Sequence, residues 1–206
     1  MHSAEISVDV SNLQLNNGGQ PLFPAPLAIH CDRRFLNIVV GKNGTGKSRI
    51  LDILSLRKEN PASAVVRRIG YENSTDVAYL PQMFFDVFDI RVKDIVRLAA
   101  SRWSSSVSFT QPNILGFPIS SNVELGALSG GQRQLLLFWL VSMQPLRVHI
   151  YDEPFRHLDG EASAYVRSTI EGQVKMEKLV IISEHSAHTA WKVPCNRTNL
   201  GTNIPA

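Results

Sequence analysis

The stretch Phe35-Leu36-Asn37-Ile38-Val39-Val40-Gly41-Lys42-Asn43-Gly44-Thr45-Gly46-Lys47-Ser48 decides the fold. It begins as a mostly apolar run, typical of a buried strand, and ends in the pattern G-x-x-x-x-G-K-[ST]. The residues from Gly46 to Leu56 then place apolar side chains at helical spacing. A strand, a glycine-rich turn and a helix in this order bring backbone N–H groups together around a phosphate. The stretch therefore predicts a nucleotide-phosphate site in an α/β domain.

The residue types of this loop suit a nucleoside triphosphate with a metal ion. We expect Lys47 to reach the β- and γ-phosphates and Ser48 to ligate Mg²⁺. Arg49, which follows, adds a charge that either attracts phosphate or points outward. The predicted phosphate ligands are Gly41, Lys42, Asn43, Gly44, Thr45, Gly46, Lys47, Ser48 and Arg49.

The rest of the chain alternates strand-like and helix-like segments. Residues 6–10 alternate like an exposed strand, and 27–30 suggest a second strand. Further strands are expected at 65–66, 77–80, 148–151 and 179–182, and helices at 92–100, 130–143 and 160–173, the last capped by Asp159. Alternation of this kind predicts an α/β fold whose sheet is mostly parallel.

An acidic pair follows the apolar run Val148 to Tyr151. Because the run is strand-like, its end would lie beside the phosphate loop, where Asp152 would hold the magnesium ion directly or through water. Glu153 is one residue further and would polarise the attacking water as general base. The pair therefore predicts hydrolysis of the bound nucleotide, with ATP and Mg²⁺ as cofactors.

A second anion-binding element stands in Leu128-Ser129-Gly130-Gly131-Gln132. A serine and two glycines at a helix start form another phosphate cradle, which one ATP does not need from the same chain. The simplest explanation is that this cradle serves the ATP of a partner. With these motifs, the chain resembles the ATP-binding cassette (ABC) family over roughly Glu5 to Ala190.

The resemblance implies roles for several further residues. Gln82 matches a glutamine that contacts magnesium, Asp159 ends a loop that crosses the dimer interface, and His185 matches a histidine that touches the γ-phosphate. Taken singly, Gln82 would be an exposed polar residue and His185 a core histidine. The implied sites are catalytic Glu153, His185 and Lys47; nucleotide-binding Gln82, Ser129, Gly130, Gly131, Gln132 and Asp159; and metal-binding Ser48, Gln82 and Asp152.

The resemblance also implies a domain plan, an α/β P-loop NTPase core with an N-terminal antiparallel β portion and a short inserted α-helical lobe. Residues 1–206 form one domain, with the core at 1–82 and 128–206 and the lobe at 83–127. The chain departs from the family in four places. Arg49 follows Ser48 where a small hydroxyl residue is common, and Leu135 to Leu140 replaces a small, Ala-Arg-rich run. Asn16-Asn17 stands where an aromatic residue usually stacks on adenine, and Phe155-Arg156-His157 replaces small residues.

Bulk properties limit the function classes. The 206 residues carry a net charge of +3, which without a clustered patch argues against nucleic acid as a partner. The start shows no apolar signal segment, and the longest apolar run, Leu135 to Val141, is too short to cross a bilayer. Cys31 and Cys195 are expected to be reduced thiols. We therefore expect a cytoplasmic protein, peripheral on the cytoplasmic face of a membrane.

The motif series favours an ATPase that powers a membrane transporter. It would pair head-to-tail with a second cassette, as a homodimer or heterodimer, and act on a multi-span membrane subunit supplied by another chain. An alternative is a cassette ATPase that acts on DNA or another macromolecule, because Asn43 to Leu51 echoes a pattern of chromosome and repair ATPases. A non-hydrolysing interaction subunit is a third possibility, against which Lys47, Asp152 and Glu153 speak.

Overall fold

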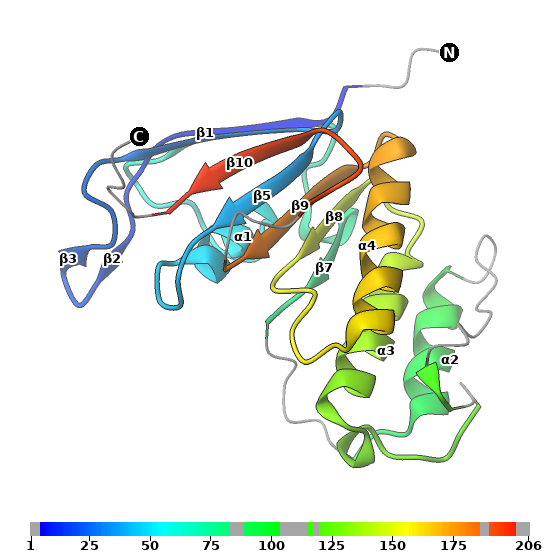
Figure 1. Ribbon diagram of the computed structural model, residues 1–206. Helices are drawn as coiled ribbons and strands as arrows, with labels where there is room; N and C mark the ends of the chain where they lie inside the picture. Colours follow the sequence, from blue (N-terminus) through cyan, green and yellow to red (C-terminus); the bar gives the residue numbers. More distant parts are fainter. Residues whose placement is uncertain (1–4, 83–88, 104–114, 118–119, 186–189, 201–206) are drawn as a thin grey trace.

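A five-stranded parallel sheet forms the centre of the protein (Figure 1). The computed structural model describes residues 5–82, 89–103, 115–117, 120–185 and 190–200. The strand order is β10-β5-β9-β8-β7, with every neighbouring pair parallel. The strands are β5 (Leu36–Val40), β7 (Val77–Leu80), β8 (Val148–Tyr151), β9 (Leu179–Glu184) and β10 (Cys195–Asn199).

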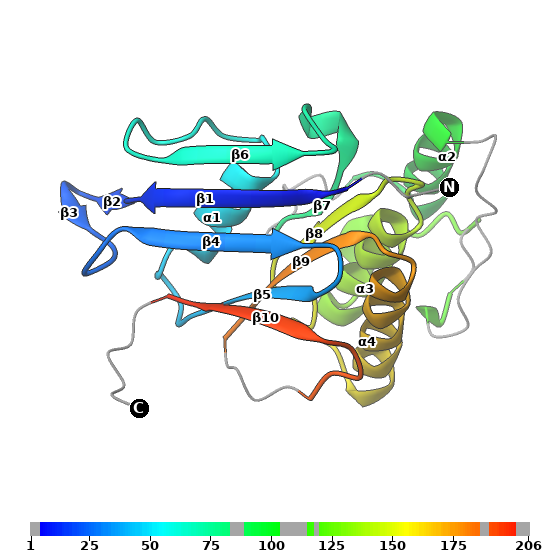
Figure 2. The ribbon, with the colours of Figure 1, turned by 90° about the horizontal axis from the view of Figure 1, so that it is seen from above.

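A separate antiparallel sheet covers helix α1 (Lys47–Leu54), which lies behind it in Figure 2. Its strands run in the order β4 (Leu27–Asp32), β1 (Ser7–Leu13) and β6 (Val65–Ile69). The prediction of an exposed N-terminal strand is wrong, because β1 is the middle strand and its Val8 is fully buried. A short hairpin, β2 (Asn16–Asn17) and β3 (Gln20–Pro21), extends beyond β1.

The parallel sheet separates two hydrophobic cores. One core packs α1 and the antiparallel sheet against one face, and the other packs α3 (Gly130–Ser142) and α4 (Gly160–Lys175) against the opposite face. Neighbouring residues in a strand therefore enter different cores: Ile38 belongs to the core of α3 and α4, and Val39 to the core of α1. Because both faces are covered, the inner strands read as continuous apolar runs, which made them visible in the sequence.

The α/β class, the parallel sheet and the antiparallel N-terminal portion are confirmed. The polar strand β10 was not predicted from the sequence. Helix α2 (Val92–Trp103) and the 3-10 turn Leu125–Ala127 lie in the predicted lobe, while 83–88, 104–114 and 118–119 lie outside the described residues. The division into one core and one lobe remains a prediction. None of the described helices has both the length and the apolar composition of a bilayer span.

Candidate functional site

Four parallel strands deliver the predicted site residues to one edge of the sheet. Strand β5 ends at the glycine-rich loop, β7 is followed by Gln82, β8 by Asp152, and β9 by His185. These strands are parallel, so their carboxyl ends meet, and crevices outside such ends are where open α/β sheets bind ligands. The topology alone therefore gathers segments that lie far apart in the sequence.

The glycine-rich loop has the backbone that its pattern requires. Gly46 has φ 91°, a left-handed conformation, and leads directly into α1. The ammonium group of Lys47 is buried and donates to the carbonyls of Gly41 at 2.8 Å and Lys42 at 3.2 Å. The Thr45 hydroxyl also donates to the Lys42 carbonyl, at 2.8 Å. The loop is thus closed around its own lysine, with that lysine at its centre.

The carboxylate of Glu153 is the meeting point of the site. Its Oε1 lies 3.4 Å from Lys47 Nζ and 3.1 Å from His185 Nε2. Its Oε2 accepts a hydrogen bond from Gln82 Nε2 at 2.8 Å. Gln82 in turn accepts from the Ser48 hydroxyl through Oε1, at 3.4 Å. The structure therefore brings together the predicted base, lysine, histidine, serine and glutamine.

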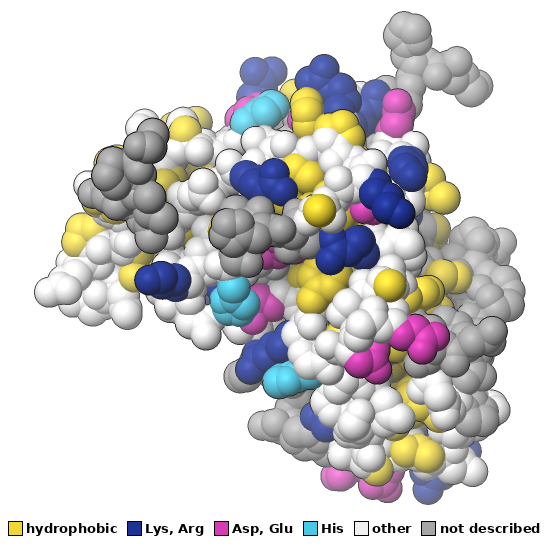
Figure 3. All heavy atoms as spheres, in the orientation of Figure 1, with side chains coloured by type: hydrophobic (Ala, Val, Ile, Leu, Met, Phe, Trp, Pro, Cys, Tyr) yellow, Lys and Arg dark blue, Asp and Glu magenta, His cyan; other side chains and the backbone are white. Residues whose placement is uncertain are grey.

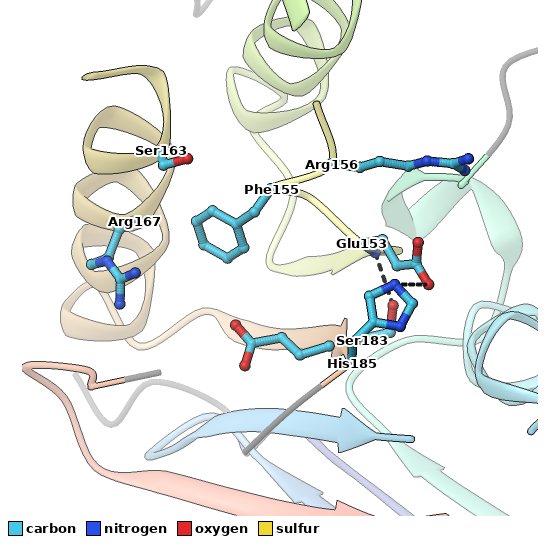
Figure 4. Close-up of a pocket in the computed structure, with 8 residues that line it drawn as sticks. Glu153, Phe155, Arg156, Ser163, Arg167, Ser183 and His185 are labelled. Carbon is cyan, nitrogen blue, oxygen red and sulfur yellow. Dashed lines mark hydrogen bonds and ion pairs between the residues drawn. The ribbon is translucent and has the colours of Figure 1, made fainter. Parts of the chain in front are cut away.

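Ser183 is a site residue that the sequence did not reveal. Its hydroxyl donates a short hydrogen bond to Asp152 Oδ1 and accepts the backbone N–H of Glu153 at 2.8 Å. Glu153 has φ 49°, a left-handed conformation that non-glycine residues rarely adopt. Figure 4 shows Ser183 and His185 next to Glu153. In the sequence, a serine within the apolar strand β9 gives no sign of a function. The structure shows its role, because the fully buried Ser183 contacts both Asp152 and Glu153.

The two carboxylates have opposite pKa shifts. Burial raises the pKa of Asp152 above its usual value, and Ser183 and Ser48 only partly offset this effect. Burial also acts to raise the pKa of Glu153, but His185, Lys47 and Gln82 together outweigh it and leave that pKa below its usual value. Glu153 is therefore ionised at neutral pH and can accept a hydrogen bond from water.

The surroundings of Asp152 fit a magnesium ion. Asp152 is 1% exposed, and its Oδ2 is a buried oxygen without a hydrogen-bond partner among the described residues. A buried carboxylate oxygen in this condition is costly unless a cation or water meets it. No group of three His, Cys, Asp or Glu side chains suited to a metal occurs in the described segments, so Ser48 and Gln82 would supply the other oxygens.

A cavity of about 410 Å³ lies over the glycine-rich loop. Its lining includes Gln82 and Glu153 as well as Asn17 and Leu22 of the hairpin segment. Asn17 and Leu22 were not predicted as site residues, because the sequence around Asn17 is typical of a turn. The remaining lining residues belong to the loop and to the start of α1: Asn43, Gly44, Gly46, Lys47, Ser48 and Arg49.

The serine-glycine motif does not line this cavity. Ser129 caps α3: its hydroxyl accepts the N–H of Gln132 at 3.2 Å, and Gln132 Oε1 accepts the N–H of Ser129 at 3.1 Å. Because Ser129 Oγ accepts in this pair, its own O–H remains able to donate to a phosphate oxygen. Ser129, Gly131, Gln132 and Asp159 line a different cavity of about 330 Å³, whose lining residues are all absent from the first.

Gly131 is required by a close approach of the backbone. A Cβ at this position would lie 2.6 Å from the carbonyl oxygen of His157, whereas one on Gly130 would make ordinary contacts from 3.7 Å. The loop that follows Glu153 therefore rests directly on the tip of α3. The same loop ends at Asp159, whose carboxylate caps α4 by accepting the Ala162 N–H at 2.8 Å, as the sequence predicted.

Glu153 also lines a third cavity, of about 320 Å³ (Figure 4). Phe155 and Arg167 form one wall, with the Arg167 guanidinium 5.6 Å from the Phe155 ring centre. Arg156 and His185 also line it. Of the residues at which the sequence departs from the family, Phe155 and the exposed Arg156 line this cavity together with Glu153, whereas His157 lies against the tip of α3.

Charges on the face drawn in Figure 3 are mixed. Lysine and arginine side chains are spread among acidic, polar and apolar ones on this face, rather than gathered in one continuous patch. This distribution agrees with the modest net charge of +3.

Comparisons with known proteins identify the family. Residues 27–156 match the family model described as ABC transporter. Among curated relatives, an ATP-binding cassette sub-family F member 3 homolog of Encephalitozoon cuniculi is 29% identical over 70% of this chain. This chain spans only 24% of that relative's length. The cytochrome c biogenesis ATP-binding export protein CcmA of Xanthomonas campestris is 24% identical, with 92% of both chains covered.

A solved structure supports the fold. The ATP-binding subunit of an ABC transporter superposes with a TM-score of 0.76 at 20% identity, covering 94% of this chain and 85% of that one. The family model covers more than half of the chain, and the strand ends present the motifs of that family on one edge. The chain therefore belongs to the ABC transporter family.

Proposed function

We propose that this protein binds and hydrolyses Mg-ATP in a dimer of two cassettes, and that this cycle powers a membrane transporter. One observation carries the proposal: the ionised carboxylate of Glu153 is held by Lys47, Gln82 and His185, and the adjacent Asp152 has a buried oxygen without a hydrogen-bond partner among the described residues. A base, a phosphate-binding cation and a metal-ligating oxygen are the parts that phosphoryl transfer to water requires.

The residues would divide the chemistry as follows. Lys47 would exchange its contact with Glu153 for the phosphate oxygens, leaving the carboxylate free to orient a water molecule and take its proton. His185 and Gln82 would fix the carboxylate, since each already contacts one of its oxygens. Ser48, Gln82 and Asp152 would hold Mg²⁺, which when bound neutralises charge on the phosphates.

The dimer follows from where the second phosphate cradle lies. Ser129 and Gly131 are outside the cavity over Lys47, yet the free O–H of Ser129 and the α3 N-terminus suit a phosphate. In a head-to-tail pair, the Ser129 tip of one copy would close the Lys47 cavity of the other. Gly130, Gln132 and Asp159 would join that interface.

The transport role rests on the family and on the relatives. The CcmA relative is named as an export protein, and a 26% identical relative from Haemophilus influenzae is named as a molybdate import ATP-binding protein. We infer that a multi-span membrane subunit from another chain docks on this protein, which would then lie on the cytoplasmic face of the membrane. Affinity purification in detergent tests this: a co-purifying multi-span protein supports it, and co-purifying nucleic acid would favour the alternative.

Mixing two inactive variants tests the shared site. Lys47→Ala removes the phosphate lysine, and Ser129→Arg blocks the cradle, so each variant alone should hydrolyse ATP at least about a hundredfold more slowly. A mixed dimer contains one intact pair, Lys47 from one copy and Ser129 from the other. Random mixing should therefore restore about a quarter of the wild-type rate. A mixture as inactive as its components would contradict the head-to-tail arrangement.

Glu153→Gln tests the base. The amide keeps the shape of the side chain but cannot take a proton, so turnover should fall by about a hundredfold or more while ATP binding remains. Light scattering should then show ATP-dependent dimers of the variant. Arg67→Ala, which changes an exposed residue of β6, is the control for an unrelated loss of charge. Wild-type hydrolysis by Glu153→Gln would refute the assignment.

A further inference from the structure

The part of the cavity over the glycine-rich loop in which a nucleoside would lie (the nucleoside end) has no aromatic side chain among its described lining residues. Gln82 and Glu153, which hydrogen-bond to each other, mark where the terminal phosphate would react, so we place the nucleobase at the hairpin residues Asn17 and Leu22 and at Arg49, whose side chain contacts the hairpin. These three residues come from the hairpin segment and the first turn of α1. None of the described lining residues carries an aromatic ring.

Phe23 does not supply the missing ring. It is 2% exposed and belongs to the core beneath the antiparallel sheet. Its ring lies 3.8 Å from where a Cβ on Gly46 would stand, so it packs under the loop. Leu22, which also contacts that point, at 3.2 Å, lies between the hairpin and the loop. The core therefore keeps Phe23 away from a nucleotide.

Arg49 and Asn17 are the polar groups at this end. Arg49 is exposed, and its Nη1 donates to the carbonyl of Asn16 at 2.7 Å, which ties the start of α1 to the hairpin. A tethered guanidinium is a flat, charged surface that stacks on aromatic rings, and a nucleobase is such a ring. The exposed amide of Asn17 has both donors and an acceptor, so by rotating it can pair with the edge of either purine.

We propose that Arg49 stacks on the nucleobase with Asn17 at its edge, and that the site accepts ATP and GTP alike. The inference rests on the proposed function, because it assigns the substrate class of the same site. A rigid aromatic shelf or a buried pair of edge contacts would select one base. The Asn17 amide, which can rotate, and the flat face of the Arg49 guanidinium do not select between adenine and guanine, because each can make its contact with either base. The triphosphate, which ATP and GTP share, contributes equally to the affinity for both nucleotides.

The test compares three ligands by isothermal titration calorimetry: ATP, GTP and inorganic tripolyphosphate, each with Mg²⁺, on Glu153→Gln protein to suppress turnover. We expect ATP and GTP to bind within about fivefold of each other, because an exposed amide pairs with both bases. ATP binding more than about thirtyfold tighter than GTP would overturn this inference alone. If none of the three binds, the proposed function fails as well.

Two substitutions locate the base. Arg49→Ala should weaken ATP and GTP by about fivefold and leave tripolyphosphate nearly unchanged, because a stacking cation acts only on a ligand that has a base. Arg49→Lys should fail to restore the loss, since it keeps the charge without the plane. An equal loss for tripolyphosphate would make Arg49 a phosphate contact and overturn the stacking. Arg67→Ala, with the same charge change on β6, should alter none of the three affinities.

Asn17→Tyr is the converse experiment. An aromatic ring on the hairpin should tighten ATP and GTP by about fivefold or more through stacking, and leave tripolyphosphate unchanged. Circular dichroism and thermal melting establish that each variant is folded. A folded Asn17→Tyr protein without tighter purine nucleotide binding would show that the hairpin does not face the base, which overturns the proposal.

Discussion

Replacing Ser183 by alanine should damage both the folding stability and the catalytic rate of this protein. The fully buried hydroxyl makes two hydrogen bonds, one to Asp152 Oδ1 and one from the N–H of Glu153 at 2.8 Å. Alanine leaves a buried N–H unpaired and removes a bond to a charged acceptor. Each of these losses is of the order of 1–3 kcal/mol, so we expect about 2–4 kcal/mol less stability, since the two losses overlap.

The catalytic effect follows from the backbone of Glu153. Its left-handed conformation, φ 49°, costs of the order of 1–3 kcal/mol and persists because neighbouring contacts hold it. Without Ser183 the backbone can relax, which would move the carboxylate away from the water that we propose it orients. A displacement near 1 Å costs about a hundredfold in rate, so kcat should fall by about that factor with little change in KM for ATP.

The assay pairs urea denaturation with steady-state ATPase measurements. Ser142→Ala is the matched control, because Ser142 is also buried but its hydroxyl donates only to the Trp139 carbonyl within its own helix, at 2.9 Å. It should lose about 1 kcal/mol and keep the wild-type kcat. The reasoning is refuted if Ser183→Ala hydrolyses ATP at the wild-type rate, or if both variants lose activity equally.

Two further predictions concern packing and pH. Gly131→Ala places a Cβ 2.6 Å from the His157 carbonyl oxygen and should cost about 1–3 kcal/mol. Gly130→Ala places a Cβ in ordinary contact, 3.7 Å from the His157 side chain, and should melt close to wild type without nucleotide. Equal melting temperatures would exclude the contact. Burial, together with the nearby charge of Lys178, lowers the pKa of His149 from 6.5 to about 3. As the pH falls below 6.5, His149 therefore becomes protonated in the unfolded chain but stays neutral in the folded chain. The free energy of unfolding should therefore drop by about 2 kcal/mol between pH 6.5 and 4.5, and His149→Phe should abolish that part of the drop.

Much of the fold was predictable because its signals are local. The apolar strand, the glycine loop and α1 are adjacent in the sequence, and Asp159 caps α4 three residues from its N–H partner. Buried parallel strands can also be predicted, because they appear in the sequence as apolar runs. Strand β10 was missed because its polar residues at the sheet edge carry no such run.

Parts of the candidate site were not predictable, because they depend on contacts between distant segments. Ser183 acts on residues 30 and 31 positions away, and Gly131 is required by the carbonyl of His157. The burial of Phe23 also follows from packing of the antiparallel sheet. No local pattern contains these relations.

The sequence by itself determined which chemical groups follow the strands: a glycine-rich loop with its lysine, an acidic pair, and a second helix start of serine and glycine on the same chain. These depend on residue type and short spacing, which a linear pattern preserves. The tertiary structure alone decided how Glu153 is held, why the tip of α3 needs glycine and which groups border the nucleoside end. Those outcomes arise because close packing brings side chains from separate strands to within hydrogen-bonding distance, and close packing is a property of the folded chain as a whole.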